Sequence, residues 1–208
     1  MSGTFRLSSI SALSSSPYTG AHKASLLGQL WIAKLTWPAR VLALVHNMQG
    51  FFDALEGPVN PVRMFDHKRM APVTLSGGSE PWSDGTFFTD GSGWSDGYAP
   101  ALIAAVAQGG RILVMEGLPA STECFRRGDL IGVQGYLYEL KFGVTANASG
   151  EAAVTVQPGM RVGAAIGDPV TLYRPTVPMR LASDSEAAIN RTFDWGEPFS
   201  LTFVEDIP

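Results

Sequence analysis

Three Asp-Gly steps, in a stretch rich in glycine, serine and tryptophan, are the residues most suited to bind a metal ion. Asp84, Asp90 and Asp96 are each followed by glycine, and Trp-Ser-Asp-Gly occurs at both 82–85 and 94–97. Spaced carboxylates between glycine turns suit a hard cation such as calcium. The EF-hand order of ligands is absent, however, and no glutamate closes the loop at the required distance. We therefore expect no metal site and interpret the segment as a hairpin loop with Asp-Gly turns.

Aromatic residues in the same stretch favour a different role. Trp82, Phe87, Phe88 and Trp94 lie in a polar setting, where large apolar rings are costly to expose to water. Exposed aromatic side chains frequently anchor protein interfaces. We therefore predict that residues 71–97 form a loop whose four aromatic side chains contact a neighbouring subunit.

The histidines and the cysteine do not form a recognisable catalytic pattern. His22, His46 and His67 do not fall at metal-ligand spacings, and Cys124 has no histidine-bearing context around it. Phosphate-binding loops and the Gly-x-Ser-x-Gly nucleophile motif are also absent. We expect ordinary histidines, a small apolar cysteine side chain and no cofactor.

Four carboxylates leave one catalytic alternative open. Glu116, Glu123, Asp129 and Glu139 offer the two acidic groups that a glycan hydrolase needs. Asp129 follows a glycine, a position more typical of a turn. We expect no catalytic residue among the four. The alternatives are a small glycan hydrolase and a carbohydrate-binding module that stacks sugars on tryptophans of the 71–97 loop.

Composition excludes several classes of protein. The chain has 208 residues, 45% hydrophobic and 16% charged, enough to bury a core in one domain or two small ones. A net charge of −4 and a pI of about 5.3 argue against a nucleic-acid partner. The apolar run at 99–107 is too short to span a bilayer, and the N-terminus lacks the apolar core of a signal peptide. One cysteine excludes an internal disulfide, so we expect folding in a bacterial cytoplasm.

The first third of the chain predicts a strand, a helix and a second strand. Apolar residues on both faces of 26–37 indicate a strand that is covered, at least in part, on both sides. Apolar residues at helical spacing predict a helix over 38–56, which Gly-Pro ends, and 62–66 predicts the returning strand. Residues 1–25 lack periodicity, so we expect a loop or arm with a short edge strand at 4–7. Both a contact with a neighbouring subunit and a frayed end fit this segment.

Short strands separated by turn residues dominate the rest of the chain. Gln134-Gly135 and residues 147–150 are typical of hairpin turns, and 99–107 is either a strand segment or a short helix. Closely spaced strands of this kind suit a small barrel. The expected strands are 101–106, 111–116, 129–133, 136–144, 152–156, 170–173, 179–182, 191–195 and 199–204.

Several segments of this sequence follow one another in an order that is also found in one family of proteins. They are Phe-Arg-Arg-Gly-Asp-Leu-Ile at 125–131, Tyr-Leu-Tyr-Glu-Leu at 136–140, the run Ala-Ser-Gly-Glu-Ala-Ala-Val-Thr-Val-Gln-Pro-Gly-Met-Arg at 148–161 and Pro-Met-Arg-Leu at 178–181. With Leu-Thr-Trp at 35–37, the helix that follows and Asn-Pro-Val-Arg-Met-Phe at 60–65, this order resembles distal-tail and tail-hub proteins of long-tailed bacteriophages and prophages. The resemblance spans most of residues 30–205 and depends on order and spacing.

The resemblance implies a fold and a structural role. The fold would be mainly β, with a ring-forming β-sandwich-like domain from residues 1–70 and 179–208 and one helix at 38–56. Residues 98–178 would form an inserted small β-barrel-like domain. The protein would be a non-enzymatic virion component, assembled in the host cytoplasm, whose hexameric ring joins the tail tube to the tail hub, tip or baseplate. Its partners would be further copies of itself, the tube protein and hub or tip proteins, with no nucleic acid and no membrane.

Overall fold

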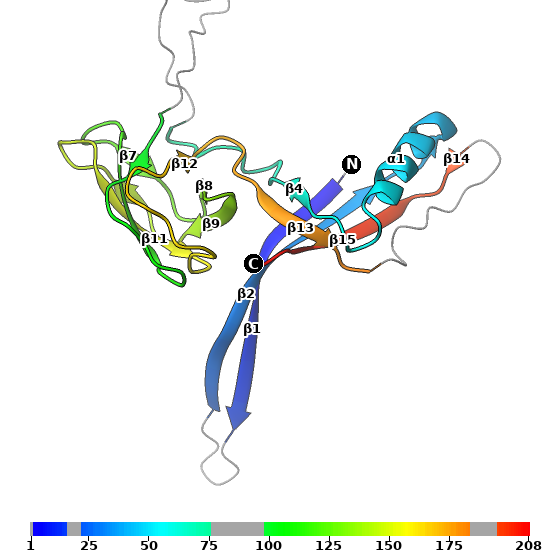
Figure 1. Ribbon diagram of the computed structural model, residues 1–208, viewed down its shortest axis with the longest axis horizontal. Coiled ribbons are helices and arrows are strands. Elements are labelled where there is room, and N and C mark those ends of the chain that lie inside the picture. Colours follow the sequence, from blue (N-terminus) through cyan, green and yellow to red (C-terminus); the bar gives the residue numbers. More distant parts are fainter. Residues whose placement is uncertain (1, 16–21, 76–97, 184–194) are drawn as a thin grey trace, which may run out of the picture. The chain divides into compact units, whose positions relative to one another are not determined.

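The computed structural model describes residues 2–15, 22–75, 98–183 and 195–208. The Asp-Gly steps and the four aromatic residues of the 71–97 loop, Trp82, Phe87, Phe88 and Trp94, lie outside the described residues. The fold is mainly β, as predicted, and α1 is the one helix in these ranges (Figure 1). The chain divides into two compact units, Met1–Met64 with Pro178–Ile207, and Phe65–Val177. The second unit therefore includes residues 65–75 and all of the predicted 98–178 insertion except Pro178.

The first unit is built on a five-stranded sheet in the order β1-β2-β15-β13-β4. Its strands are β1 (Ser2–Ser15), β2 (His22–Trp37), β4 (Val62–Met64), β13 (Val177–Leu181) and β15 (Phe199–Glu205). Alternation along the strands buries one face, because successive side chains point to opposite sides of a sheet. Buried side chains of that face include Trp31, Ala33, Met179, Leu201 and Phe203. With α1 beside this sheet, the unit is β-sandwich-like with one flanking helix.

The described part of the N-terminal segment lies in strands, so the loop or arm predicted there is wrong, whereas the edge strand predicted at 4–7 is confirmed as part of a longer one. β1 runs for 14 residues and pairs antiparallel with β2 along its whole length, which starts β2 at His22 and not at residue 26. The serine-rich sequence of β1 carries little strand preference of its own. Strand preference depends strongly on the neighbouring strand. The partner that decides the conformation is distant in sequence and invisible to local patterns.

The helix is shorter than the predicted 38–56. α1 spans Leu42–Ala54, while Arg40–Val41 forms β3 and pairs with β14 (Trp195–Gly196). Phe52 is buried and its ring meets those of Trp37 and Phe199 edge-on, at centroid distances of 6.0 Å and 5.9 Å.

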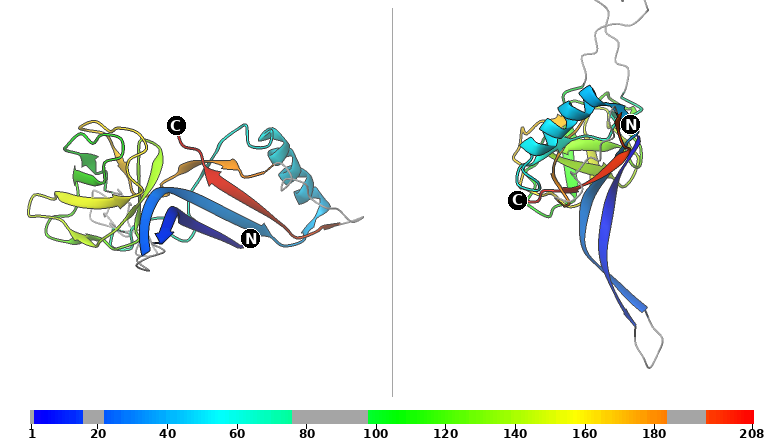
Figure 2. Two further views of the ribbon diagram at one scale, coloured as in Figure 1. Left: turned by 90° about the horizontal axis from the view of Figure 1, so that it is seen from below. Right: turned by 90° about the vertical axis from the view of Figure 1, so that its right-hand side faces the viewer.

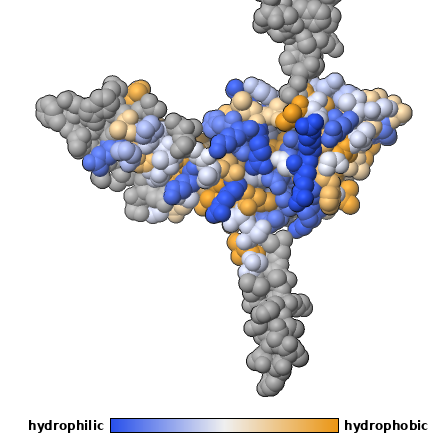
Figure 3. Space-filling model, turned by 180° about the vertical axis from the view of Figure 1, so that it is seen from behind, coloured by the Kyte–Doolittle hydropathy of each residue, from blue (hydrophilic) through white to orange (hydrophobic). Residues whose placement is uncertain are grey.

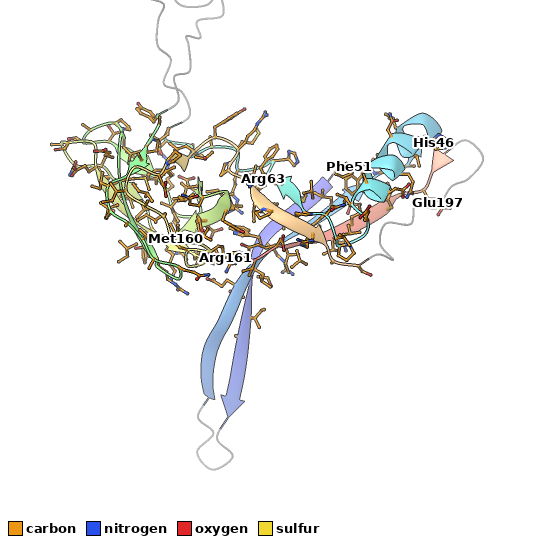
Figure 4. All side chains as sticks on the ribbon, viewed as in Figure 1. His46, Phe51, Arg63, Met160, Arg161 and Glu197 are labelled. Atoms are coloured by element: carbon orange, nitrogen blue, oxygen red, sulfur yellow. The ribbon has the colours of Figure 1, made fainter. Side chains whose placement is uncertain are left out.

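The apolar stripe of α1 is not buried throughout. Val45 and Leu55 share the buried side with Phe52, whereas Leu44 and Phe51 are each 49% exposed. Phe51 comes from the same helix as His46, which is also exposed (Figure 4). The stripe is therefore wider than the surface that the sheet offers to it.

The second unit contains a six-stranded sheet in the order β12-β8-β9-β11-β6-β5. Its edges approach each other through a bridge between Ala101 and Pro169, and the Val170 amide donates to the Pro100 carbonyl at 2.8 Å. The sheet therefore closes into the small barrel-like unit that was predicted (Figures 1 and 2). The strands are β5 (Ala101–Leu102), β6 (Ile112–Glu116), β8 (Leu130–Val133), β9 (Tyr136–Leu140), β11 (Ala152–Gln157) and β12 (Val170–Thr171).

Local details of the barrel differ from the sequence prediction. The expected strand at 101–106 ends at Leu102, no helix forms at 99–107, and the expected 136–144 strand stops at Leu140. Two further strands, β7 (Glu123–Phe125) and β10 (Val144–Thr145), pair outside the main sheet. The turn at Gln134-Gly135 is confirmed, with φ angles of 52° and 76° at the two residues.

A single apolar cluster fills the barrel. Tyr138 is fully buried, and its hydroxyl oxygen accepts a hydrogen bond of 3.0 Å from the backbone amide of Arg161, beside Met160 in the loop after β11 (Figure 4). This bond satisfies the polar end of an otherwise apolar side chain in the core. Other members of the cluster include Leu102, Leu113, Met115, Phe125, Ile131, Leu140, Val154 and Val156.

A substitution at Gly150 tests how closely the turn before β11 packs against its neighbour. Its φ is 76°, and a Cβ atom there would collide with the carbonyl oxygen of Leu118, whose amide donates to the Gly150 carbonyl at 3.1 Å. Gly167 has a similar φ of 87° but open space around that position. We expect Gly167→Ala to cost roughly 1–2 kcal/mol of backbone strain and Gly150→Ala to cost clearly more. Equal losses in urea unfolding would contradict the collision.

Adjacent phenylalanines on α1 form a matched pair for testing the sheet contact. Phe52→Asp places a charge among apolar rings and should cost more than the ~3–5 kcal/mol of a truncation to alanine. Phe51→Asp changes a half-exposed side chain and should cost about 1 kcal/mol or less. Soluble yield and thermal unfolding of the two variants measure the difference, and similar melting of both would refute this packing of α1.

Candidate functional site

The outer edge of β1 is the most extensive unpaired backbone in the described part of the chain. β1 stands at one end of the sheet order, so β2 is its only described neighbour. Its sequence contains no proline and one charged residue, Arg6, and its pairing with β2 has one irregularity, between Ile10 and Ser11. Proline, charge and repeated bulges are the usual devices that stop an edge strand from pairing with another chain. β1 has few of them.

The β1–β2 hairpin also continues beyond the rest of the sheet. β15 pairs with β2 from Trp37 to Ile32 and stops there, whereas the pairing of β1 with β2 goes on to Ser15 and His22. The distal part is therefore a two-stranded ribbon (Figures 1 and 2). Ile10 in this part is 49% exposed. Two-stranded ribbons are marginally stable alone in water.

A buried carboxylate holds the point where the ribbon leaves the sheet. Glu205 is the last residue of β15, lies on the covered face and is 6% exposed. Its Oε2 atom accepts a hydrogen bond of 2.9 Å from the backbone amide of Trp31, one residue beyond the last pair of β15 with β2. The side chain thus extends the ladder by one bond and fixes where β15 and β2 separate.

The opposite edge of the same sheet is short. β4 covers only Val62–Met64 and follows a proline. Arg180, on the neighbouring β13, donates to the carbonyl of Pro58 at 3.0 Å and forms an ion pair with Asp206 at 2.8 Å. These bonds fasten the loop between α1 and β4. The two edges of the sheet are therefore different surfaces.

A network of charged side chains lies on the outside of the barrel. Arg69 donates to Asp66 and to Glu139, each at 2.8 Å, and to the Gly128 carbonyl at 3.0 Å. The second oxygen of Glu139 accepts from the Gln157 amide at 2.8 Å. Arginine suits this position because its planar group makes several hydrogen bonds at once. The network joins the segment after β4 to β9 and β11.

Asp129 in the loop between β7 and β8, and Glu123 at the start of β7, lie beside this network. The Asp129 carboxylate accepts from the backbone amide of Arg126 at 2.7 Å, as expected for a turn residue, and Glu123 lies 3.8 Å from the Arg126 side chain. Burial raises the pKa of Asp129, and the hydrogen bond from Arg126 opposes that rise. Glu116 ends β6 on the surface. Asp129 and Glu139 thus stand near each other and have bonds that position the chain.

A small pocket lies next to Glu139. Its volume is about 190 Å³, and its walls come from β9, β11, the loop between β7 and β8 and the loop after β9. Leu140 is fully buried in the barrel core behind the pocket, and Phe142, 62% exposed, stands among charged groups. In the space-filling view, strongly hydrophilic and hydrophobic residues lie side by side on the surface of the barrel-containing unit (Figure 3). The lining residues are Arg127, Glu139, Leu140, Lys141, Phe142 and Gln157.

The cysteine and two of the histidines occupy positions within the fold and do not form a group with one another. Cys124 is fully buried, its thiol donates to the Thr122 carbonyl at 3.3 Å, and burial raises its pKa. His67 packs on the Phe65 ring at 4.4 Å between centroids, and His22 begins β2. Among the described residues, no three His, Cys, Asp or Glu side chains are grouped as a metal site would need.

Comparisons with protein families and with curated proteins found no match. No helix in the described ranges has the length and apolar content to cross a lipid bilayer. The charged network was not foreseen from the sequence, because Arg69 and Glu139 are far apart in the chain and Arg69 belongs to no motif.

Arg69 provides a test of the charged network. Arg69→Met removes the cation from two partly buried carboxylates and should cost about 1.5–3 kcal/mol, the range for hydrogen bonds to charged groups. Arg69→Lys should recover part of this loss. The control is Lys68→Met, an exposed neighbour with the same charge change. If chemical denaturation gives Arg69→Met the same stability as Lys68→Met, the network does not stabilise the barrel.

Proposed function

We propose that this chain is a structural subunit of a bacteriophage tail, which assembles with further copies of itself into a ring between the tail tube and the tail tip or baseplate. The observation that carries the proposal is the long outer edge of β1. The resemblance of residues 30–205 to distal-tail and tail-hub proteins is the reason for assigning the assembly to a phage tail. The ring would be a hexamer, as in the family that the sequence resembles, and the virion tail tip would be its location.

An unprotected edge of this length favours assembly. Every second residue of an antiparallel edge strand directs its backbone N–H and C=O outward, where another strand can pair with them, and monomeric proteins usually block such edges. β1 has 14 residues and Arg6 as its single charge. Pairing with a neighbouring subunit would satisfy these groups, and it would also support the distal ribbon, which β15 does not reach.

A ring also needs a second, different surface on each subunit. Cyclic contacts of more than two copies are heterologous, because one patch of a subunit meets another patch of the next. The first unit offers such surfaces: the sheet order sets β1 and β4 at opposite edges, and α1 exposes Leu44 and Phe51. These features support self-assembly over a solitary binding module. The aromatic residues predicted as contacts, Trp82, Phe87, Phe88 and Trp94, would add to the same assembly.

The proposal is tested by shortening the hairpin. Ser8 pairs with Leu30, so an Asn-Gly turn in place of residues 9–29 keeps the register and the part of the hairpin next to β15. We expect the full chain to form concentration-dependent oligomers in light scattering, and the shortened variant to remain a folded monomer. Ile166→Asp, a change at a 69% exposed residue of the barrel unit, is the control and should assemble normally.

Two results would contradict the structural role. One is a wild-type protein that stays monomeric at every concentration. The other is a shortened variant that assembles as well as the wild type. A monomer whose melting temperature rises with added glycans would favour the carbohydrate-binding alternative, since a ligand stabilises the folded state that binds it.

A further inference from the structure

The charges around the pocket beside Glu139 do not balance. Arg127, Lys141 and Glu139 are the charged residues of its lining. Both oxygens of Glu139 are already bonded, one to Arg69 and the other to Gln157. In the described part of the chain, no ion pair joins Arg127 or Lys141 to a carboxylate, so two cations face the pocket beside Glu139, whose charge Arg69 offsets in part because Arg69 also pairs with Asp66.

This arrangement suits an oxyanion. A guanidinium binds carboxylate or phosphate through paired hydrogen bonds, and an ammonium adds a compact charge. Arg69, which Glu139 shares with Asp66, weakens the repulsion between Glu139 and an anion, because its guanidinium lies 2.8 Å from that carboxylate. Gln157 is held in place by its bond to Glu139 and presents a polar amide in the same wall.

An apolar surface stands beside the cations. Phe142 is 62% exposed although it lines the pocket, and Leu140 lies beneath the surface between Glu139 and Lys141. The C–H faces of a sugar ring are apolar and pack against aromatic rings, whereas its hydroxyls need polar partners. A volume of about 190 Å³ is below the ~300–1,000 Å³ of pockets for drug-sized ligands, so one small unit fits.

We propose that this pocket binds a single acidic sugar unit, whose carboxylate or phosphate group contacts Arg127 and Lys141 while its ring packs on Phe142. The site belongs entirely to the second unit of the chain, so it does not depend on the proposed ring. It differs from the carbohydrate-binding alternative drawn from the sequence, which relied on tryptophans of the 71–97 loop.

The binding test uses the full chain and four small probes. Glucuronate and glucose 1-phosphate carry the two kinds of anion on a sugar, glucose lacks the anion, and inorganic phosphate lacks the sugar. We expect amide shifts in NMR at Leu140, Lys141 and Phe142 with the acidic sugars, weaker binding as salt is added, and much smaller shifts with glucose or phosphate. The acidic sugar that binds more tightly identifies the anion.

Variants separate the pocket from general surface charge. Arg127→Ala and Lys141→Ala should each weaken acidic-sugar binding about tenfold, equivalent to about 1.4 kcal/mol, and Phe142→Ala should reduce binding of the sugars but not of inorganic phosphate. Arg126→Ala is the matched control, because this neighbouring arginine is not part of the lining and should leave affinity within about twofold.

Three outcomes would each contradict the proposal. The first is that neither acidic sugar shifts the amide signals of the pocket residues, and the second is that Arg126→Ala weakens binding as much as Arg127→Ala. The third is that inorganic phosphate binds as tightly as glucose 1-phosphate, which would show attraction of an anion without recognition of a sugar. Loss of ring assembly in the shortened hairpin variant would not alter these results, so the two proposals are tested separately.

Discussion

Backbone pairing along both edges of β2 is the interaction on which the first unit depends. β2 pairs with the whole of β1 on one side and with most of β15 on the other. The helix packs where this pairing is complete, since Phe52 meets Trp37 of β2 and Phe199 of β15. Where β15 ends, the Glu205 carboxylate takes over one bond to β2, and beyond it the hairpin has no described support from the sheet.

The unequal lengths of these strands connect stability with assembly. A strand that is paired on both edges and covered on one face contributes to a monomer. A ribbon with unpaired edges gains little from the monomer and much from a second chain, because pairing would satisfy groups that otherwise contact water. The features that make β1 unusual for a solitary protein are therefore the ones that a ring subunit would use.

In the second unit, the two edges of the main sheet approach each other. Its sheet closes through the bridge between Ala101 and Pro169, so the barrel does not present a comparable free edge. Its distinctive surface is instead the Arg69, Glu139 and Gln157 network with the pocket beside it. Under the two proposals, the first unit would offer backbone for assembly and the second would offer side chains for a ligand.

Local sequence patterns determined much of the architecture. Alternation in 152–156 and 199–204, the Gln134-Gly135 turn and the helical spacing around Phe52 each depend on neighbours in the chain, so they predicted elements that the structure contains. The closely spaced turns likewise predicted a small barrel, because short strands joined by tight turns have few other ways to bury their apolar faces.

Only the tertiary structure decided the features that depend on distant partners. The full length of the serine-rich β1 requires β2, and the two residues of β3 require β14, so only residues 4–7 of β1 were predicted as a strand and β3 was not predicted. Arg69 and Glu139 meet because the segment after β4 folds against β9, which no spacing in the sequence encodes. Composition showed that carboxylates and cations were present. Their pairing, which leaves Arg127 and Lys141 to face a pocket, is a property of the fold, because an ion pair forms between groups that the backbone brings within hydrogen-bond distance.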